Sequence, residues 1–291
     1  MLADFALLYC ALFWGLSFPT MKILVGVYPT CWLLFVRFLS GAVLIYLFFH
    51  KRINSSIRKN FFGGAIIGIL LFIAIGAQTV GLNYIGGGRS AFISAVYVLL
   101  VPLIIWAFRK VFPGWVTLGA ACLCIAGMYL LTDDLSGAVN AGDILTFICA
   151  VVFAVQIIAI NHYTYECDPV VLSFVEFMTL AVLSFVCSML FETRASLIDR
   201  ASLPELLFTI TFCTFGCYVV QICAQKYAKP SHAAIIMSLE SVFGLFSSII
   251  FLGESITLRA AAGCALIFMS VMIAELEPFI HIKHAKRELK V

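Results

Sequence analysis

Charged residues are scarce in this chain. Of its 291 residues, 18 are Lys or Arg and 15 are Asp or Glu, so that 11% are charged, whereas 63% are hydrophobic. Soluble globular domains usually contain about 25% charged residues. This shortage excludes a soluble domain and predicts a protein whose surface lies mostly in lipid.

The sequence also lacks the motifs of enzyme active sites. Its five histidines are dispersed and form no HExxH helix. Asp133 and Asp134 are adjacent, but the second acidic cluster that metal-dependent prenyl transfer requires is missing. No glycine-rich phosphate loop is predicted, because no segment has the pattern of a strand. We therefore predict no enzyme, no catalytic residue and no cofactor.

Metal and nucleic-acid chemistry are not indicated either. Nearly all of the eleven cysteines lie in apolar runs without neighbouring His or acidic residues, which favours packing over metal binding. No basic tract or aromatic platform suggests nucleic acid as a partner. The first apolar run follows no basic stretch and precedes no small-residue cleavage site, so we expect a retained helix instead of a signal peptide.

Long apolar segments, in contrast, recur along the whole chain. A hydrocarbon core of about 30 Å takes roughly 20 residues of helix to cross. The second segment is expected to end in a basic loop, HKRINSSIRKN. We predict an all-α integral membrane protein with ten transmembrane helices, at residues 4–25, 29–49, 61–84, 90–108, 115–131, 144–161, 169–191, 203–226, 232–252 and 258–274.

Two stretches far apart in the chain have nearly matching patterns. QTVGLNYIGGGRSAFISAVYVLL begins at Gln78, and QICAQKYAKPSHAAIIMSLESVF begins at Gln221. The offset of 143 positions places Tyr97 on Glu240. The chain is therefore predicted to contain an internal repeat.

A second match extends the repeat to both halves. FVRFLSGAVL lies over FVEFMTLAVL and places Arg37 on Glu176. Each half then contains five helices, at residues 1–132 and 140–276, followed by a basic tail at 277–291. Because five is odd, the second repeat is inverted relative to the first, as in many secondary transporters.

The basic residues are unevenly divided between the two sides of the membrane. With the N-terminus inside, twelve Lys or Arg residues fall on the inner side, five on the outer side, and Arg37 within the membrane. Cytoplasmic loops of membrane proteins carry such an excess. We expect a multi-pass protein of the cell (inner) membrane with both termini in the cytoplasm.

Three ionisable residues fall deep inside predicted helices: Arg37, Glu176 and Glu240. A charge at such depth costs about 2.5 to 3.5 kcal/mol on insertion scales, so it normally faces a partner or a water-filled cavity. Arg37 and Glu176 are predicted to differ in depth by about 6 Å, which an Arg side chain can span. Two interpretations stay open for them, a structural ion pair and a role in proton coupling.

Polar and aromatic groups recur at matching depths in the two halves. Gln221, for example, shares a helix face with Tyr218 and Gln225. Each such group alone is more typical of contacts between helices. The symmetric set, however, predicts a cavity where the repeats meet. The candidate substrate-binding residues are Trp14, Ser17, Gln78, Tyr97, Gln156, Gln221 and Glu240.

The chain resembles the EamA-type branch of the drug/metabolite transporter superfamily. The resemblance rests on AQKYAKPSHAAIIMSLESVF with the following LGE, and on GLNYIGGGRSAFISAVYVLLVP. It implies a cavity lined by helices 1, 3, 4, 6, 8 and 9, which carry the seven candidates, and often export of amino acids. Two departures are Lys110 and Val111 where the second half has Gly253 and Glu254, and Ser241 where a proline often follows the glutamate.

Our hypothesis is a secondary transporter that moves a small-molecule substrate through the bilayer by alternating access. Amino acids or related polar or amphipathic compounds are the expected substrates, export is the expected direction, and a proton or counter-substrate is the expected second solute. The unit is expected to be a monomer or a homodimer. The alternatives are an exchanger or importer, for example of a nucleoside derivative, and a membrane-embedded enzyme or sensor.

Overall fold

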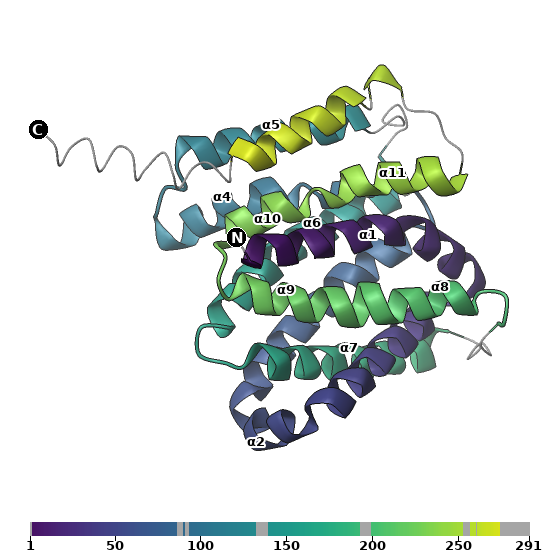
Figure 1. Cartoon of the computed structure of the whole chain (residues 1–291). Coiled ribbons are helices and arrows are strands. Elements are labelled where there is room, and N and C mark those ends of the chain that lie inside the picture. The colour runs from purple at the N-terminus through teal and green to yellow at the C-terminus, as the bar shows by residue number, and fades with distance from the viewer. Residues whose placement is uncertain are drawn as a thin grey trace, which may run out of the picture.

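Helices make up all regular secondary structure in the described part of the computed structural model, which comprises residues 2–85, 90, 93–131, 139–192, 199–252, 257–259 and 261–273 (Figure 1). The elements are α1 (Leu2–Val27), α2 (Thr30–Gly81), α4 (Tyr97–Arg109), α5 (Trp115–Leu131), α6 (Ala141–Tyr163), α7 (Pro169–Phe191), α8 (Leu203–Phe208), the π-helix η1 (Thr209–Gly216), α9 (Cys217–Gln225), α10 (Pro230–Met237), α11 (Glu240–Leu252) and a helix at Ala261–Ile273.

Some sequence-based expectations concern residues outside these ranges. They are the Asp133–Asp134 pair, the Gly253–Glu254 departure and the tail at 277–291.

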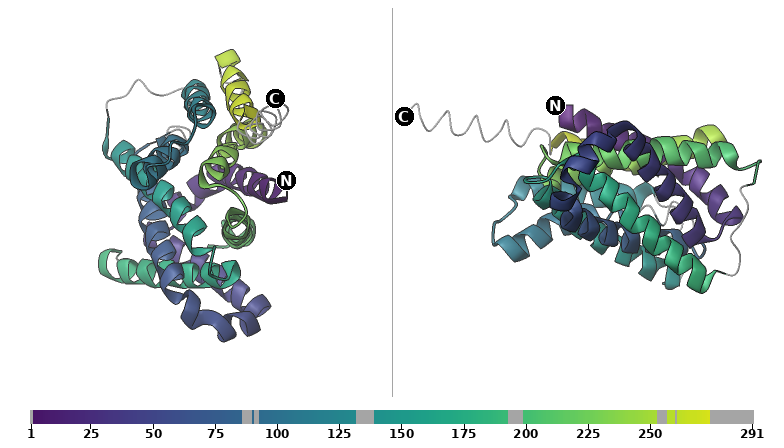
Figure 2. Two further views of the ribbon diagram at one scale, coloured as in Figure 1. Left: turned by 90° about the vertical axis from the view of Figure 1, so that its left-hand side faces the viewer. Right: turned by 90° about the horizontal axis from the view of Figure 1, so that it is seen from below.

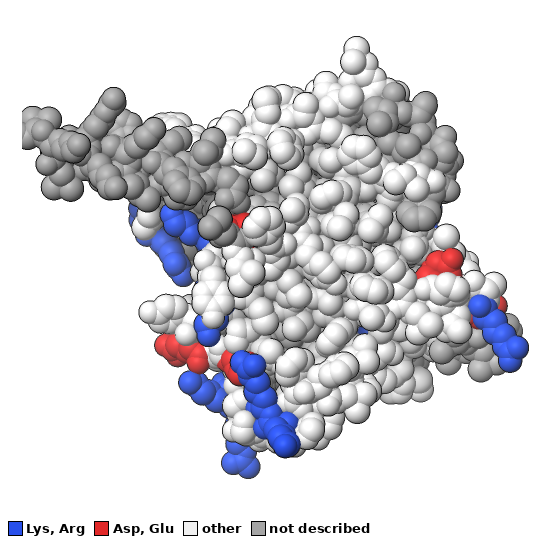
Figure 3. Space-filling model, viewed as in Figure 1, with Lys and Arg blue, Asp and Glu red and all other residues white. Residues whose placement is uncertain are grey.

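The surface of the bundle is that of a protein embedded in lipid. Five continuous helical stretches in the described residues are long and apolar enough to cross a membrane. Large apolar side chains such as Ile73, Val182 and Phe185 are exposed on the outside of the bundle. On the face seen in Figure 3, charged side chains gather at the two ends of the helices, and the surface between them is almost free of charge.

Helix α2 corrects the prediction of a basic loop at residues 50–60. These residues are helical, and α2 runs through 52 residues with a bend at Phe49 (φ −128°, ψ 19°). A straight helix of that length would be about 78 Å long, more than twice the hydrocarbon core, so the bend lets α2 cross twice. The loop prediction was wrong because HKRINSSIRKN contains no Gly or Pro to end a helix.

The bend of α2, which we call the elbow (residues 49–60), is fastened to the second half of the chain. Arg52 forms an ion pair with Asp168. Asn60 accepts a hydrogen bond from the Asp168 amide at 2.7 Å. Asp168 in turn caps α7 by accepting a hydrogen bond from the Val170 amide at 3.0 Å. Asp168 thus caps the N-terminus of α7 and also contacts the elbow.

The two halves are interleaved instead of lying side by side. Helix α1 packs mainly on α9 and α11 of the second half, and its repeat mate α6 packs mainly on α2 and α4 of the first. Figure 1 and the end-on view in Figure 2 (left) both show α1 between α9 and α11. Each half therefore contributes its first helix to the other, and the space between them is walled by both.

Glycine at position 15 allows the closest of these contacts. A Cβ atom there would lie 2.5 Å from the Phe243 Cβ and 2.7 Å from the Glu240 carbonyl oxygen. Gly244 and Ser247 belong to the same contact, because the Ser247 hydroxyl donates to the Gly15 carbonyl at 3.3 Å and Gly244 faces Phe18. The small residues on the Glu240 helix face therefore let α1 approach α11.

Candidate functional site

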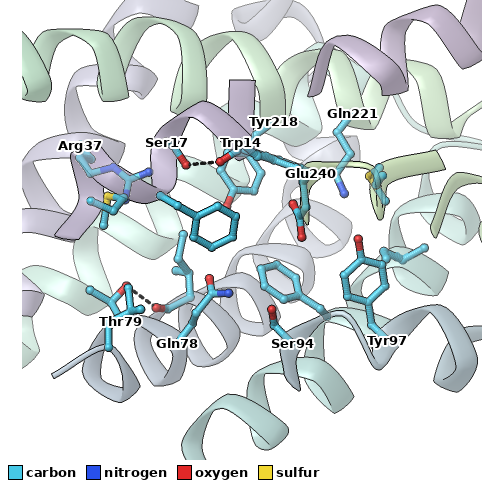
Figure 4. Close-up of a pocket in the computed structure, with 17 residues that line it drawn as sticks. Trp14, Ser17, Arg37, Gln78, Thr79, Ser94, Tyr97, Tyr218, Gln221 and Glu240 are labelled. Atoms are coloured by element: carbon cyan, nitrogen blue, oxygen red, sulfur yellow. Dashed lines mark hydrogen bonds between the residues drawn. The ribbon is translucent and has the colours of Figure 1, made fainter. Parts of the chain in front are cut away.

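A cavity of about 90 Å³ lies between the two halves. It is large enough for several water molecules. Its wall is built by α1, α2, α4, α6, α9, α10 and α11, so that both repeats contribute (Figure 4). Six of the seven candidate residues line it: Trp14, Ser17, Gln78, Tyr97, Gln221 and Glu240.

Helices 4 and 9 of the predicted set are both interrupted at the cavity. Residues 93 and 94 are helical, 95 and 96 form a turn, and α4 begins at Tyr97. In the second half α10 ends at Met237, 238 and 239 form a turn, and α11 begins at Glu240. The two breaks stand at the same point of the repeat.

The hydrogen bonds at these breaks repeat as well. Three backbone amides donate in the same order, at 3.2, 3.0 and 3.1 Å in the first half and at 3.2, 3.1 and 3.0 Å in the second. The donors are Val96, Val98 and Leu100 in the first half and Leu239, Ser241 and Phe243 in the second. The Met237 carbonyl has no partner among the described residues, and Met237 lines the cavity. The inverted repeat thus places two broken helices face to face, a device that secondary transporters use at substrate sites.

Glu240 and Tyr97 open the two new helices and point toward the same space (Figure 4). Within the described residues no group forms a hydrogen bond with the Glu240 carboxyl. The Tyr97 ring meets the Phe153 ring edge-on at 6.4 Å. The Glu240 carboxyl is therefore free to meet a bound solute.

Arg37 brings a cation to the wall of the same cavity. It is 4% exposed, and its Nε and Nη2 atoms donate to the Thr214 hydroxyl at 3.3 and 3.1 Å. Its Nη1 atom contacts the Met21 sulfur at 3.1 Å. Neither partner is negatively charged, and no carboxylate in the described part of the chain forms an ion pair with Arg37. The guanidinium charge is thus uncompensated in this structure.

The direct pair of Arg37 with Glu176 is therefore not formed in this structure. Glu176 is fully buried on α7, and its Oε1 atom accepts a hydrogen bond from Gln156 Nε2 at 3.0 Å. Gln156 is the one candidate that does not line the cavity. Its amide is turned away because a buried carboxyl needs a hydrogen-bond donor, and Gln156 supplies it.

Tyr218 and Met21 on the cavity wall, and Thr214 behind Arg37, were absent from the predicted set. Tyr218 lies against Trp14, with ring centroids 5.1 Å apart, and it lines the cavity. Thr214 and Met21 hold Arg37. Thr214 stands four residues before Tyr218, so extending the polar face of Tyr218 and Gln225 by one helical turn would have found it. No signal in the sequence points to Met21.

The π-helix η1 contributes hydrogen-bonding groups to the region beside the cavity. In a π-helix the backbone bonds span five residues, and such segments often mark functional sites. The Cys213 carbonyl of η1 accepts a hydrogen bond from Trp14 Nε1 at 3.1 Å. The indole is thereby fixed at the cavity wall beside Tyr218.

This fold and cavity define a multi-pass membrane protein with the construction of a transporter. Residues 1–133 and 140–275 each match the EamA-like transporter family, and the chain belongs to that family. A protein of Archaeoglobus fulgidus described as an uncharacterized transporter is 34% identical over 274 residues, which are 94% of this chain and 86% of that protein.

A solved crystal structure has the same fold. It superposes with a TM-score of 0.80 over 94% of this chain and 96% of its own, at 16% sequence identity. The predicted fold class, an all-α membrane protein built of two EamA-type repeats, is confirmed. The protein is a membrane transporter.

Proposed function

We propose that this transporter carries small zwitterionic metabolites, amino acids or related compounds, by alternating access. The observation that carries the proposal is a pair of unmatched charges on one cavity wall. Arg37 brings a guanidinium without a carboxylate partner, and Glu240 brings a carboxyl without a hydrogen-bond donor, within the residues that the structure describes.

A solute that carries both a carboxylate and an ammonium group gives Arg37 and Glu240 their missing partners at the same time. A buried ion without a counter-ion costs several kcal/mol even after the surroundings relax. A guanidinium can bind a carboxylate through two parallel hydrogen bonds. A carboxylate group near Arg37 and an ammonium group near Glu240 therefore give the favourable arrangement, whereas a solute with one charge leaves the other side unmatched.

The mirrored helix breaks support alternating access. Each half has a helix interrupted at the cavity, and the two halves are inverted relative to each other. An inverted pair can exchange conformations, so that the cavity opens first to one side and then to the other. Tyr97 and Glu240 stand at the breaks, so they would line the cavity both when it is open to one side and when it is open to the other.

The sequence supports a proposed orientation and energy source. The excess of Lys and Arg supports cytoplasmic termini in the cell (inner) membrane, and the family resemblance favours export. A gradient of protons or of a counter-substrate supplies the driving force, because the sequence has no nucleotide-binding loop. The proposed unit is a monomer or a homodimer, since one chain walls a complete cavity.

Uptake into liposomes that contain the purified protein tests the two-charge requirement. Neutral amino acids are compared with their methyl esters, which lack the carboxylate, and with their N-acetyl derivatives, which lack the ammonium. We expect at least tenfold slower transport of both derivatives. Equal rates for either derivative and its parent would refute the proposal. Counterflow without a pH gradient identifies an exchanger, including one for nucleoside derivatives.

The Arg37→Gln substitution tests the carboxylate end. A hydrogen bond to a charged group contributes about 1.5 to 3 kcal/mol, so we expect the apparent Kd of a neutral amino acid to rise about tenfold or more. Arg58→Gln is the matched control, because Arg58 is exposed on the elbow. An unchanged Kd for the Arg37 variant would remove this residue from the site.

A further inference from the structure

We propose that Glu176 is the proton-binding site of the transport cycle, and that in this conformation it holds the proton in a cyclic acid–amide pair with Gln156. The inference extends the proposed function, because it names the coupling ion and the residue that carries it. It concerns a side chain outside the cavity wall.

The hydrogen bonds of the pair are half complete. Glu176 Oε1 accepts from Gln156 Nε2 at 3.0 Å. The other two oxygens, Glu176 Oε2 and Gln156 Oε1, are buried and have no hydrogen-bond partner among the residues that the structure describes. Both are acceptors when the carboxyl is ionised, so neither can satisfy the other.

One proton completes the pair. A neutral carboxyl gains an O–H donor, and a proton on Glu176 Oε2 can be donated to Gln156 Oε1. The acid and the amide then exchange two hydrogen bonds, and both orphaned oxygens gain a partner. Buried polar atoms without partners are rare in proteins, which favours the protonated form here.

No cation in the described part of the chain forms an ion pair with Glu176 in place of the proton. Arg37, which α2 brings to this region, is bonded to Thr214 and Met21. From α9 comes Tyr218, and from α6 come Gln156 and, beside Tyr218, Cys149. The other charged residues and the histidines of α2 and α6 lie at the elbow or at helix ends: His50, Lys51, Arg52, Arg58, Lys59, Asp143 and His162.

Tyr218 connects this site to the cavity. Its ring lies 6.1 Å from the ring of Phe177, the neighbour of Glu176, and 5.1 Å from the ring of Trp14 on the cavity wall. It lies within electrostatic range of both Glu176 and Arg37. When the O–H bond of Glu176 breaks, the proton passes to water in the cavity, and the carboxylate keeps the hydrogen bond from Gln156 Nε2.

Gly68 explains how such a buried site can respond to movement of the helices. A Cβ atom at this position would lie 2.7 Å from the Glu176 carbonyl oxygen, so the backbones of α2 and α7 are nearly in contact there. Gln156 is on α6, which packs on α2, so a sliding of α2 on α7 that carries α6 along moves Glu176 relative to Gln156. The proton affinity of the pair is thereby linked to the conformation.

Infrared spectroscopy of the Glu176→Gln variant tests whether the carboxyl is neutral. In the intact protein we expect a band of a protonated carboxylic acid that this variant loses. Glutamine can keep both hydrogen bonds to Gln156, so the variant is expected to fold. The control Ser184→Ala removes another buried polar group from α7 and should keep the band. A band unchanged by Glu176→Gln would overturn the proposal, whether or not any amino acid is transported.

Transport in liposomes then tests coupling. Accumulation driven by a pH gradient, followed with an enclosed pH-sensitive dye, is compared with exchange at equal pH. We expect Glu176→Gln to lower the first at least tenfold more than the second, which a merely structural role would not do. An equal decrease of both, or accumulation that persists, would overturn the coupling role. Absence of transport by the unmodified protein would count against the proposed function and leave the infrared result valid.

Discussion

The two broken helices have the same backbone but different chemistry. The turn before Tyr97 and the turn before Glu240 have matching hydrogen bonds at matching distances, yet the first delivers a phenol and the second a carboxyl. The inverted repeat therefore supplies a symmetric frame, and single side chains make the cavity asymmetric. The same holds for the mates Arg37 and Glu176, of which one lines the cavity and the other is sealed beside Gln156.

The largest expected effect separates the two breaks. Glu240→Gln removes the negative charge at one break, and we expect transport of a neutral amino acid to fall about 10- to 100-fold, since a bond to a charged group contributes about 1.5 to 3 kcal/mol. Tyr97→Phe removes a neutral hydroxyl at the other and should lower transport by less than tenfold. Initial rates in liposomes measure both. Equal losses of transport rate in the two variants would mean that Glu240 and Tyr97 contribute equally to transport, contrary to this prediction.

A smaller effect is expected where α1 passes the second break. Gly15→Ala places a Cβ against the backbone and Cβ atoms of α11, and overpacking of this kind costs about 1 to 3 kcal/mol. Gly26→Ala on the same helix meets nothing within 4 Å and should be neutral or stabilising. Thermal unfolding in detergent compares the two variants. A similar Tm for both would contradict the close approach.

The smallest effect is expected at the elbow, outside both breaks. Arg52→Ala removes the ion pair with Asp168, and because Arg52 is exposed, the expected loss of stability is below about 1 kcal/mol. Substrate affinity should not change, since Arg52 does not line the cavity. Denaturation and binding measured on the same sample check this. A change in affinity would mean that the elbow is coupled to the site.

The sequence predicted the cavity through its repeat. Matching Gln78 with Gln221 and Tyr97 with Glu240 identified residues that line one space, because symmetric positions in an inverted repeat reach similar depths. The same symmetry misplaced Gln156. Its mate Ser17 lines the wall, but Gln156 is close enough to Glu176 to satisfy a buried carboxyl, and that contact decides the orientation.

Two features of the backbone could not be predicted from local patterns. The turns at residues 95–96 and 238–239 contain neither Gly nor Pro, so nothing in the sequence there marks an interruption, and packing of the two halves must cause it. The elbow posed the opposite problem. Polar and basic residues suggested a loop, whereas the absence of Gly and Pro and the contact with Asp168 keep it helical.

The position of α1 has a consequence for biosynthesis. Trp14 bonds to the Cys213 carbonyl, a partner 199 residues away. Helix α1 leaves the ribosome before α9 and α11, so it must wait in the bilayer until they have been inserted. Neither half can close a cavity on its own, so assembly of this protein is completed only when nearly the whole chain has been translated.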